Sequence, residues 1–350
     1  MNGYPRFGWV DIDRFLHLNN IIDSAGLENI KEKSFLITGA TGLIGTCLID
    51  ALMLYNKQGG SISIYAVGRS KEKAKSRLGE YYSDERFHFI EQDVRSPLPF
   101  SIKVDYIIPL ASNTHPFAYS QYPIETIEIN VKGAEYALQL AERCGAIVLY
   151  PSTVEVYGNA RGEDVFTEDY TGELNLKNSR SCYPESKRLS EALCQSYISE
   201  RNVDVRIVRL SRIIGPTMLE SDTKASSQFI LKALNHENIV LKSKGEQYFS
   251  YTYVADAVSA MLFVLINGKC GMSYNIANDD CNVHLQDFAH YCAEEVGQSV
   301  VFDLPSETEK RGFSIATQAI LDNHLLIGLG WKPHYGIKET ISRIIQILHN

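Results

Sequence analysis

Short segments that are apolar almost throughout recur between residues 34 and 209, and longer segments with helical periodicity separate them. Strands that are covered on both faces have continuous apolar runs of this kind, whereas strands with one exposed face alternate between apolar and polar residues. The pattern therefore predicts a parallel sheet whose strands are connected by helices. The predicted strands are 34–38, 62–67, 87–91, 104–109, 146–150 and 203–209, and the predicted helices lie near 43–57, 70–80, 121–144 and 181–201.

The segments on either side of this region have other patterns. Residues 1–33 predict an amphipathic extension that packs on the main domain, and residues 215–350 predict a smaller, mostly helical substrate domain. We expect an α/β fold in which a Rossmann-type doubly wound parallel sheet spans 34–214, and in which part of the substrate domain, about 249–276, returns to that sheet. The apolar residues of the extension are Trp9, Val10, Ile12, Phe15 and Leu16, and the later predicted helices lie near 225–236, 254–267, 284–297 and 336–348.

Composition and charge exclude several classes of protein. The 350 residues are 45% hydrophobic and 22% charged, and the formal net charge of -8 argues against a broad nucleic-acid-binding surface. The first residues lack the basic end and apolar run of a signal peptide, and no stretch reaches the roughly 18–20 apolar residues of a membrane span. The seven cysteines are scattered without zinc spacing, so we predict no metal site. We expect a cytoplasmic protein that binds neither membranes nor nucleic acid.

A glycine-rich loop follows the first predicted strand and opens a helix. Gly39 permits a sharp turn, Gly42 lets the backbone approach a pyrophosphate, and Gly45 lets the helix pack closely on the sheet. The free N–H groups at the start of the helix then bind the phosphates. The loop predicts a dinucleotide site with contacts from Gly39, Thr41, Gly42, Leu43, Ile44 and Gly45.

The end of the second predicted strand bears on the choice between NAD and NADP. An acidic residue there hydrogen-bonds the free 2′-hydroxyl of NAD, but this strand ends in Gly68-Arg69. Arg69 is suited to pair with a 2′-phosphate, which favours NADP, or else lies on a solvated loop. Asp93 contacts the adenine or caps a turn. The remaining predicted cofactor contacts are Val94, Leu110 and Ala111.

A hydroxyl, a phenol and an amine follow in the order that acid–base chemistry on a substrate hydroxyl requires. Thr153 lies where the fifth predicted strand ends, and Tyr183 and Lys187 are four residues apart on a predicted helix, so both point to one face. A nearby ammonium stabilises the phenolate and is expected to lower the pKa of the tyrosine. With 20 tyrosines in the chain this spacing alone is weak evidence, and the alternative is a surface pair. Its position after the glycine loop makes it specific.

Together, the glycine loop, the Ser152–Gly158 segment (STVEVYG) and the Cys182–Arg188 segment (CYPESKR) resemble the extended short-chain dehydrogenases, the NAD-dependent epimerase/dehydratase family. The resemblance runs from about residue 34 to Trp331 and is greatest to UDP-glucuronate decarboxylases. It implies that Thr153, Tyr183 and Lys187 are catalytic, that the nicotinamide cofactor is tightly bound, that Asn130 is a structural asparagine, and that the substrate is a nucleotide sugar. It also implies a homodimer that pairs through the helices 121–144 and 181–201.

Glu155 separates the activities found in this family. Simple 4-epimerases of the family usually lack an acid there, whereas dehydratases and decarboxylases carry one. Dehydratases often add an aspartate just before it, and here that residue is Val154; decarboxylases usually have a serine at that point. We therefore predict a decarboxylase in which Glu155 handles the proton at C5, with a 4-epimerase or a 4,6-dehydratase as alternatives. From the residues alone, the alternative is that Glu155 is a carboxylate that stabilises a turn. Two further classes stay open: an NADPH-dependent keto-sugar reductase and a non-catalytic dinucleotide-binding regulator.

The substrate side departs from the family pattern. Phe249 stands where the family usually has an arginine for the diphosphate, and Arg212 stands where it usually has an asparagine. This exchange predicts that the cation has moved to the other wall of the pocket. Basic residues at 224 and 311 are expected to complete the clamp, and otherwise are surface charges. The predicted substrate contacts are Ser112, His115, Arg212, Lys224 and Arg311, of which His115 is equally suited to stabilise a loop.

Overall fold

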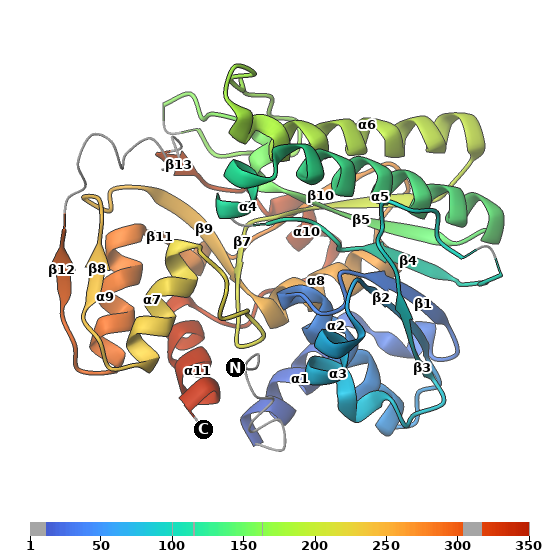
Figure 1. Ribbon diagram of the computed structural model, residues 1–350, viewed down its shortest axis with the longest axis horizontal. Coiled ribbons are helices and arrows are strands. Elements are labelled where there is room, and N and C mark those ends of the chain that lie inside the picture. The colour runs from blue at the N-terminus through green and yellow to red at the C-terminus, as the bar shows by residue number, and fades with distance from the viewer. Residues whose placement is uncertain (1–11, 100, 115, 163, 304–316, 350) are drawn as a thin grey trace.

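The computed structural model describes residues 12–99, 101–114, 116–162, 164–303 and 317–349. Its main sheet has seven parallel strands in the order β10-β6-β5-β4-β1-β2-β3 (Figure 1). Six of these strands begin and end within three residues of their predicted bounds, and the predicted Rossmann-type fold is confirmed. The strands are β1 (Ser34–Thr38), β2 (Ser63–Gly68), β3 (Phe87–Glu91), β4 (Tyr106–Pro109), β5 (Ile147–Thr153), β6 (Val205–Leu210) and β10 (Ser273–Ile276).

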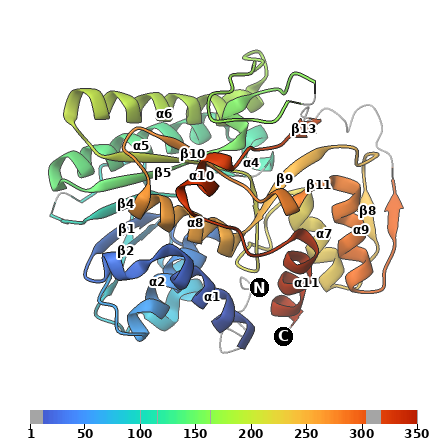
Figure 2. The ribbon, with the colours of Figure 1, turned by 180° about the vertical axis from the view of Figure 1, so that it is seen from behind.

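Helices cover both faces of this sheet. On one face α5 and α6 lie side by side over β4 and β5, and on the opposite face lie α2, α3 and α8 (Figures 1 and 2). This double coverage explains why the strand segments are apolar throughout. The helices are α2 (Leu43–Lys57), α3 (Lys71–Leu78), α5 (Pro123–Cys144), α6 (Cys182–Arg201) and α8 (Val254–Asn267).

Local sequence signals set the ends of the long helices. Pro123 occupies the first turn of α5, where the missing N–H costs nothing, and Gly145 ends that helix with a left-handed φ of 69°. Ser70 caps α3 by accepting a hydrogen bond from the Lys73 N–H at 3.1 Å. The helix α6 ends at Asn202, which is also left-handed, with a φ of 57°. The bounds of these three helices thus follow from residues at their own ends.

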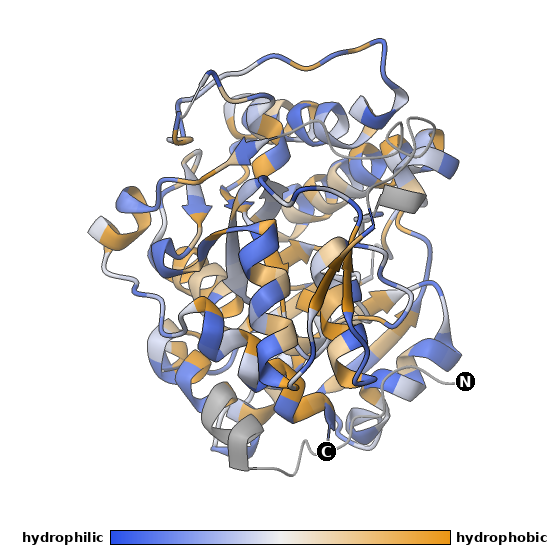
Figure 3. Cartoon of the chain, turned by 90° about the vertical axis from the view of Figure 1, so that its left-hand side faces the viewer, coloured by the Kyte–Doolittle hydropathy of each residue, from blue (hydrophilic) through white to orange (hydrophobic). Residues whose placement is uncertain are grey.

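The C-terminal part of the chain forms a smaller body beside the main sheet, and its helices carry hydrophilic and hydrophobic residues on different sides (Figure 3). The strand β10 leaves this part and pairs with β6 of the main sheet. The predicted domain boundaries themselves stay a prediction. The elements of this part are β7 (Arg212–Ile214), α7 (Ala225–Leu234), β8 (Ile239–Leu241), β9 (Tyr248–Tyr253), η5 (Asp279–Cys281), β11 (Asn282–His284), α9 (Leu285–Glu295), β12 (Val300–Phe302), β13 (Gln318–Ala319), α10 (His324–Leu329) and α11 (Ile337–His349).

The predicted N-terminal extension contains the helix α1 (Ile12–Ala25), which packs on α8 and α2. Its buried residues are Leu18, Ile21, Ile22 and Ala25. Of the residues predicted to pack there, Trp9 and Val10 and the side chains of Ile12, Phe15 and Leu16 lie outside the described part of the chain. Across the described residues, no helix is long and apolar enough to span a membrane. The remaining short helices are η1 (Leu27–Ile30), η2 (Gly79–Tyr81), α4 (Pro116–Gln121), η3 (Val154–Tyr157) and η4 (Ser179–Ser181).

Candidate active site

The glycine loop lies between β1 and α2, where the strand order of the sheet reverses. Open α/β sheets bind ligands at this position. Gly39 has a φ of 64°, and a Cβ atom there would lie 2.7 Å from the Ala111 nitrogen and from the Leu110 carbonyl carbon. A Cβ atom on Gly45 would overlap the Gly39 carbonyl oxygen. The loop, Leu110 and Ala111 are therefore packed against one another without room for side chains, as a backbone cradle for a pyrophosphate requires.

The predicted ribose and adenine contacts lie in a network of charges beside this cradle. The Arg69 guanidinium is 2.9 Å from a carboxylate oxygen of Glu125, and its side chain is 58% exposed. Asp93 accepts hydrogen bonds from the backbone N–H of Arg95 at 2.9 Å and from its guanidinium at 2.7 Å. The hydrogen bonds from Arg95 hold the pKa of the Asp93 carboxyl below its ordinary value. Asp93 thus stabilises its turn, which was one of the two predicted roles, and its contact with adenine stays a prediction.

Three residues of the predicted catalytic set come together at the carboxyl end of β5. Thr153 is the last residue of that strand, and Tyr183 and Lys187 lie on the first turns of α6. All three side chains are buried. The Lys187 ammonium donates a hydrogen bond to the Pro151 carbonyl at 2.8 Å, and the Thr153 hydroxyl is hydrogen-bonded to Tyr183. The structure therefore brings the predicted hydroxyl, phenol and amine to one place.

The ionisation of this set differs from the sequence-based expectation. Burial, together with the Glu155 carboxylate, raises the pKa of Tyr183, although the hydrogen bond from Thr153 opposes the change. The expected lowering by the ammonium is wrong for the chain as it stands, because Lys187 is turned to the Pro151 carbonyl. Burial lowers the pKa of Lys187 to about 8, and Glu191 acts in the opposite direction. The raised pKa of Tyr183 thus keeps its phenol protonated until a positive charge or a proton acceptor comes close to it.

Asn130 connects α5 with the rest of the site. Its amide oxygen accepts a hydrogen bond from the Ser112 hydroxyl at 2.7 Å, and its amide nitrogen donates to the Ser186 hydroxyl at 2.8 Å. Ser190 donates to the Asn130 carbonyl at 3.2 Å. Asn130 therefore joins the segment after β4 to the helix α6, as expected of a structural asparagine. The Ser112 hydroxyl is used in this contact, and its role in substrate binding stays a prediction.

Two residues that the sequence analysis missed, Arg180 and Tyr119, surround the predicted catalytic set. The Arg180 guanidinium is 3.3 Å from a carboxylate oxygen of Glu155 and lies over the ring of Tyr119, with 5.8 Å between Cζ and the ring centre. The Tyr119 ring stacks on the Tyr183 ring, with 4.8 Å between ring centres. Arg180 precedes Tyr183 by three residues, and that proximity was the signal available in the sequence. Tyr119 lies on α4, far in sequence from Thr153, Tyr183 and Lys187, and no motif marked it as their neighbour.

The predicted exchange of Phe249 and Arg212 brings the two side chains into contact. The strands β7 and β9 pair in parallel, and the Arg212 guanidinium lies over the Phe249 ring, with 3.4 Å between Cζ and the ring centre. One guanidinium nitrogen, Nη1, is buried without a hydrogen-bond partner among the described residues. Burial lowers the pKa of Arg212, and the charges of Glu155 and Arg180 are close enough to act on it. Arg212 therefore borders the same site with donor capacity to spare.

The other predicted substrate contacts are less well placed or lie beyond the description. The Lys224 ammonium pairs with Asp222 at 3.0 Å, and among the described residues no hydrogen bond or ion pair joins it to Arg212. His115 and Arg311 lie outside the described residues, so their predicted roles stay predictions.

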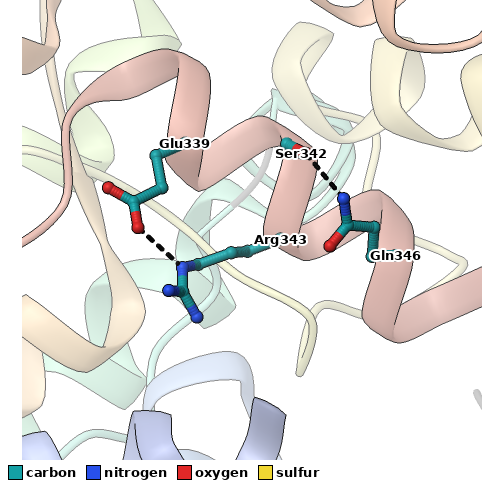
Figure 4. Close-up of a pocket in the computed structure, with 4 residues that line it drawn as sticks. All are labelled: Glu339, Ser342, Arg343 and Gln346. Atoms are coloured by element: carbon teal, nitrogen blue, oxygen red, sulfur yellow. Dashed lines mark hydrogen bonds and ion pairs between the residues drawn. The ribbon is translucent and has the colours of Figure 1, made fainter.

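A separate hollow of about 220 Å³ lies on α11 (Figure 4). It is lined by Glu339, Ser342, Arg343 and Gln346, and Glu339 and Arg343 form an ion pair one helical turn apart at 3.0 Å. Ion pairs at this spacing commonly stabilise exposed helices. None of the four residues belongs to the predicted site, and we assign this hollow no role.

Comparison with known proteins agrees with this geometry. Residues 35–277 match the model of the NAD dependent epimerase/dehydratase family. UDP-glucuronic acid decarboxylase 1 of Xenopus tropicalis is 32% identical over 318 residues, which are 90% of this chain and 72% of the relative. UDP-glucuronic acid decarboxylase 6 of Arabidopsis thaliana is 32% identical over 310 residues, which are 87% of this chain and 86% of the relative.

Solved structures agree on the fold. A double mutant of DesIV, a dTDP-glucose 4,6-dehydratase from Streptomyces venezuelae with NAD bound, superposes with a TM-score of 0.77 at 22% identity, over 89% of this chain and 96% of the other. A UDP-glucuronic acid 4-epimerase from Bacillus cereus, in complex with UDP-glucuronic acid and NAD, gives a TM-score of 0.76 at 19% identity, over 90% and 98%. The architecture is thus shared with enzymes of several activities.

Proposed function

Because this chain belongs to the NAD dependent epimerase/dehydratase family, we propose that it decarboxylates a nucleotide-activated uronic acid, with UDP-glucuronate as the first candidate substrate. The observation that carries the proposal is the convergence of Thr153, Tyr183 and Lys187 beside Glu155. The decarboxylases at 32% identity over most of both chains support it.

The glycine loop at the switch point of the sheet fits a dinucleotide. A side chain on Gly39 would overlap the backbone of the segment after β4, and a side chain on Gly45 would overlap the backbone of the loop itself. A nicotinamide cofactor held by this loop would supply reversible hydride transfer at C4 of the sugar. Tyr183 accepts the proton of the sugar 4-hydroxyl, and Thr153 hydrogen-bonds the same oxygen. The Lys187 ammonium favours the resulting phenolate once it turns from the Pro151 carbonyl toward the phenol.

Oxidation at C4 prepares the substrate for loss of CO2. A ketone at C4 of a uronic acid makes a β-keto acid, in which the bond between C5 and the carboxylate breaks with the electron pair passing to the ketone. Glu155 transfers to C5 the proton that this carbon needs after CO2 has left. Decarboxylation is favoured over dehydration because Val154 cannot protonate a departing hydroxyl, as the aspartate of many dehydratases does.

The test is the product formed from UDP-glucuronate by the purified protein with NAD(P)+. We expect CO2 and a UDP-pentose, detected by mass spectrometry, without net change in the near-ultraviolet absorbance of reduced nicotinamide. A UDP-hexuronate epimer, or a dehydrated sugar from UDP-glucose or dTDP-glucose, would assign one of the alternative activities. Steady consumption of NADPH with a keto-sugar would assign the reductase, and absence of turnover with bound nucleotide would favour the regulator.

We further propose that NADP is bound in preference to NAD. The strand β2 ends without an acid, and a 2′-phosphate would compete with Glu125 for the guanidinium of Arg69. We expect NADP+ to bind more tightly than NAD+, Arg69→Ala to weaken NADP+ binding selectively, and Glu125→Gln to strengthen it. Fluorescence titration measures all three. Equal losses for the two cofactors in Arg69→Ala, or a wild-type preference for NAD+, would contradict the proposal.

We also propose a homodimer that pairs through α5 and α6. Ile124 and Ile127 on α5 and Leu189 on α6 are exposed, and these two helices form one outer layer of the molecule (Figure 1). We expect a dimer in sedimentation equilibrium at micromolar concentration and a shift to monomer in Leu189→Glu. Leu325→Glu, the same substitution at an exposed leucine of α10, should leave the dimer intact. A wild-type monomer would exclude this interface.

A further inference from the structure

Arg180 and Glu155 form an ion pair beside Tyr183, and the distances between their charged groups are long. The two guanidinium nitrogens of Arg180 lie 3.3 and 3.4 Å from the two oxygens of Glu155. The less exposed pair of Arg209 and Glu191, by comparison, is joined at 2.7 and 3.1 Å. The side chains of Arg180 and Glu155 are also 31% and 24% exposed, so the pair is open to solvent and to a ligand.

This ion pair lies beside the residues that are proposed to react with the sugar. Glu155 lies two residues beyond Thr153, and Arg180 lies over Tyr119, whose ring stacks on that of Tyr183. Both charges also act on the pKa of Tyr183, Glu155 raising it and Arg180 lowering it. A group on C5 of a sugar whose 4-hydroxyl meets Tyr183 therefore has this ion pair as its neighbour.

The other cations near Tyr183 have other contacts or another predicted role, since Arg212, with its unpartnered Nη1, is predicted to bind the diphosphate. The Lys187 ammonium donates to the Pro151 carbonyl, and Arg188 donates to the carbonyls of Val156 and Gly172. Arg212 lies on the Phe249 ring of β9. Among the described cations near Tyr183, Arg180 is the one whose guanidinium hydrogen bonds go to a side-chain carboxylate alone, and a carboxylate of the substrate can take the place of that partner.

We propose that Arg180 binds the sugar carboxylate and so makes a nucleotide-activated uronic acid the preferred substrate class; this rests on the proposed function. The planar fork of an arginine matches a carboxylate in two parallel hydrogen bonds. Exchanging part of its contact with Glu155 for a second carboxylate leaves the guanidinium hydrogen-bonded throughout, so little desolvation is added. An uncharged sugar offers nothing that replaces this contact.

The chemistry of the reaction decides which kinetic constant Arg180 controls. As the bond between C5 and the carboxylate breaks, its electron pair moves toward the ketone. The negative charge moves with that pair, away from the carboxylate, and the departing CO2 is neutral. Arg180 therefore stabilises the bound substrate more than the transition state of this step, and its contribution belongs to KM more than to kcat. The contact no longer exists once CO2 has left, so Arg180 also favours the uronic acid over the neutral pentose product.

The test is the variant Arg180→Met, which keeps the length of the side chain and removes its charge. Calorimetric titration of the protein saturated with cofactor compares UDP-glucuronate, UDP-glucose and UDP. We expect the wild type to prefer UDP-glucuronate over UDP-glucose, and Arg180→Met to lose about 10- to 100-fold in affinity for UDP-glucuronate with little change for the other two, as expected for loss of a charged hydrogen bond. KM for UDP-glucuronate should rise by a similar factor while kcat changes only a few-fold.

Two further variants separate binding from folding. Arg180→Lys should restore part of the preference, because the charge returns without the fork. Arg201→Met, on the far end of α6 and well exposed, should behave as the wild type. Equal losses for all three ligands would mean that Arg180 only supports the site, and an unchanged preference, or none in the wild type, would also overturn the inference. A wild type that prefers UDP-glucuronate but forms an epimer would instead refute the decarboxylase proposal and leave the role of Arg180 standing.

Discussion

Tyr183→Phe is expected to bind NAD(P) and the nucleotide sugar as the wild type does and to turn over roughly 10²–10⁴-fold more slowly, the usual contribution of a general acid–base group. The phenol is buried, hydrogen-bonded to Thr153 and close to Lys187 on the same helix. A phenylalanine preserves the ring and its stacking on Tyr119, so the change removes the proton carrier alone. Single-turnover formation of reduced nicotinamide, followed by its absorbance, measures the step directly.

The matched control for this prediction is Tyr197→Phe, since Tyr197 also lies on α6 but at a distance from the predicted catalytic set. Its turnover should equal that of the wild type. Turnover near the wild-type value in Tyr183→Phe would contradict the assignment of Tyr183, whatever the cofactor. Loss of nucleotide binding in that variant would mean that the ring hydroxyl supports the fold instead.

Arg212→Ala is expected to raise KM for the nucleotide sugar strongly, because losing one partner of a desolvated charge pair costs roughly 2–5 kcal/mol. A diphosphate carries about two negative charges and needs donors when it leaves water. Arg212 has such a donor in its buried Nη1, and the ring of Phe249 holds the guanidinium in place. Cofactor affinity should hardly change, since the glycine loop lies at another part of the sheet edge. Steady-state kinetics and cofactor titration together check the expectation.

Lys224→Ala serves as the comparison for Arg212→Ala. Lys224 is paired with Asp222, so its removal should raise KM by a much smaller factor. Thermal unfolding of both variants shows whether the fold survives. A constant KM in an Arg212→Ala variant that still folds and binds cofactor would make Arg212 a scaffold residue, and the substrate would then need no diphosphate.

Much of the fold could be predicted from the sequence because its signals are local. The strands were recognisable as apolar runs, since each is covered on both faces, and the helices by their periodicity. The glycine loop could be read in the same way, because its three glycines and the helix that they open lie within a few residues. The spacing of Tyr183 and Lys187 likewise sets their common face by the pitch of one helix.

Contacts between distant segments were decided only by the tertiary structure. Arg180 meets Glu155 because α6 is laid against the end of β5, and Tyr119 reaches Tyr183 because α4 lies beside η4. The sequence alone predicts that Arg212 replaces the cation missing at Phe249. The Arg212 guanidinium lies on the Phe249 ring, however, only because β7 pairs with β9.

The ionisation of the site was decided in the same way. Lys187 was expected to lower the pKa of Tyr183, yet burial raises it, and burial depends on every segment that covers the phenol. Spacing along one helix or turn is a property of the chain that its sequence determines. Solvent exclusion and the meeting of charges from different strands are properties of the assembled layers, and no local pattern carries them.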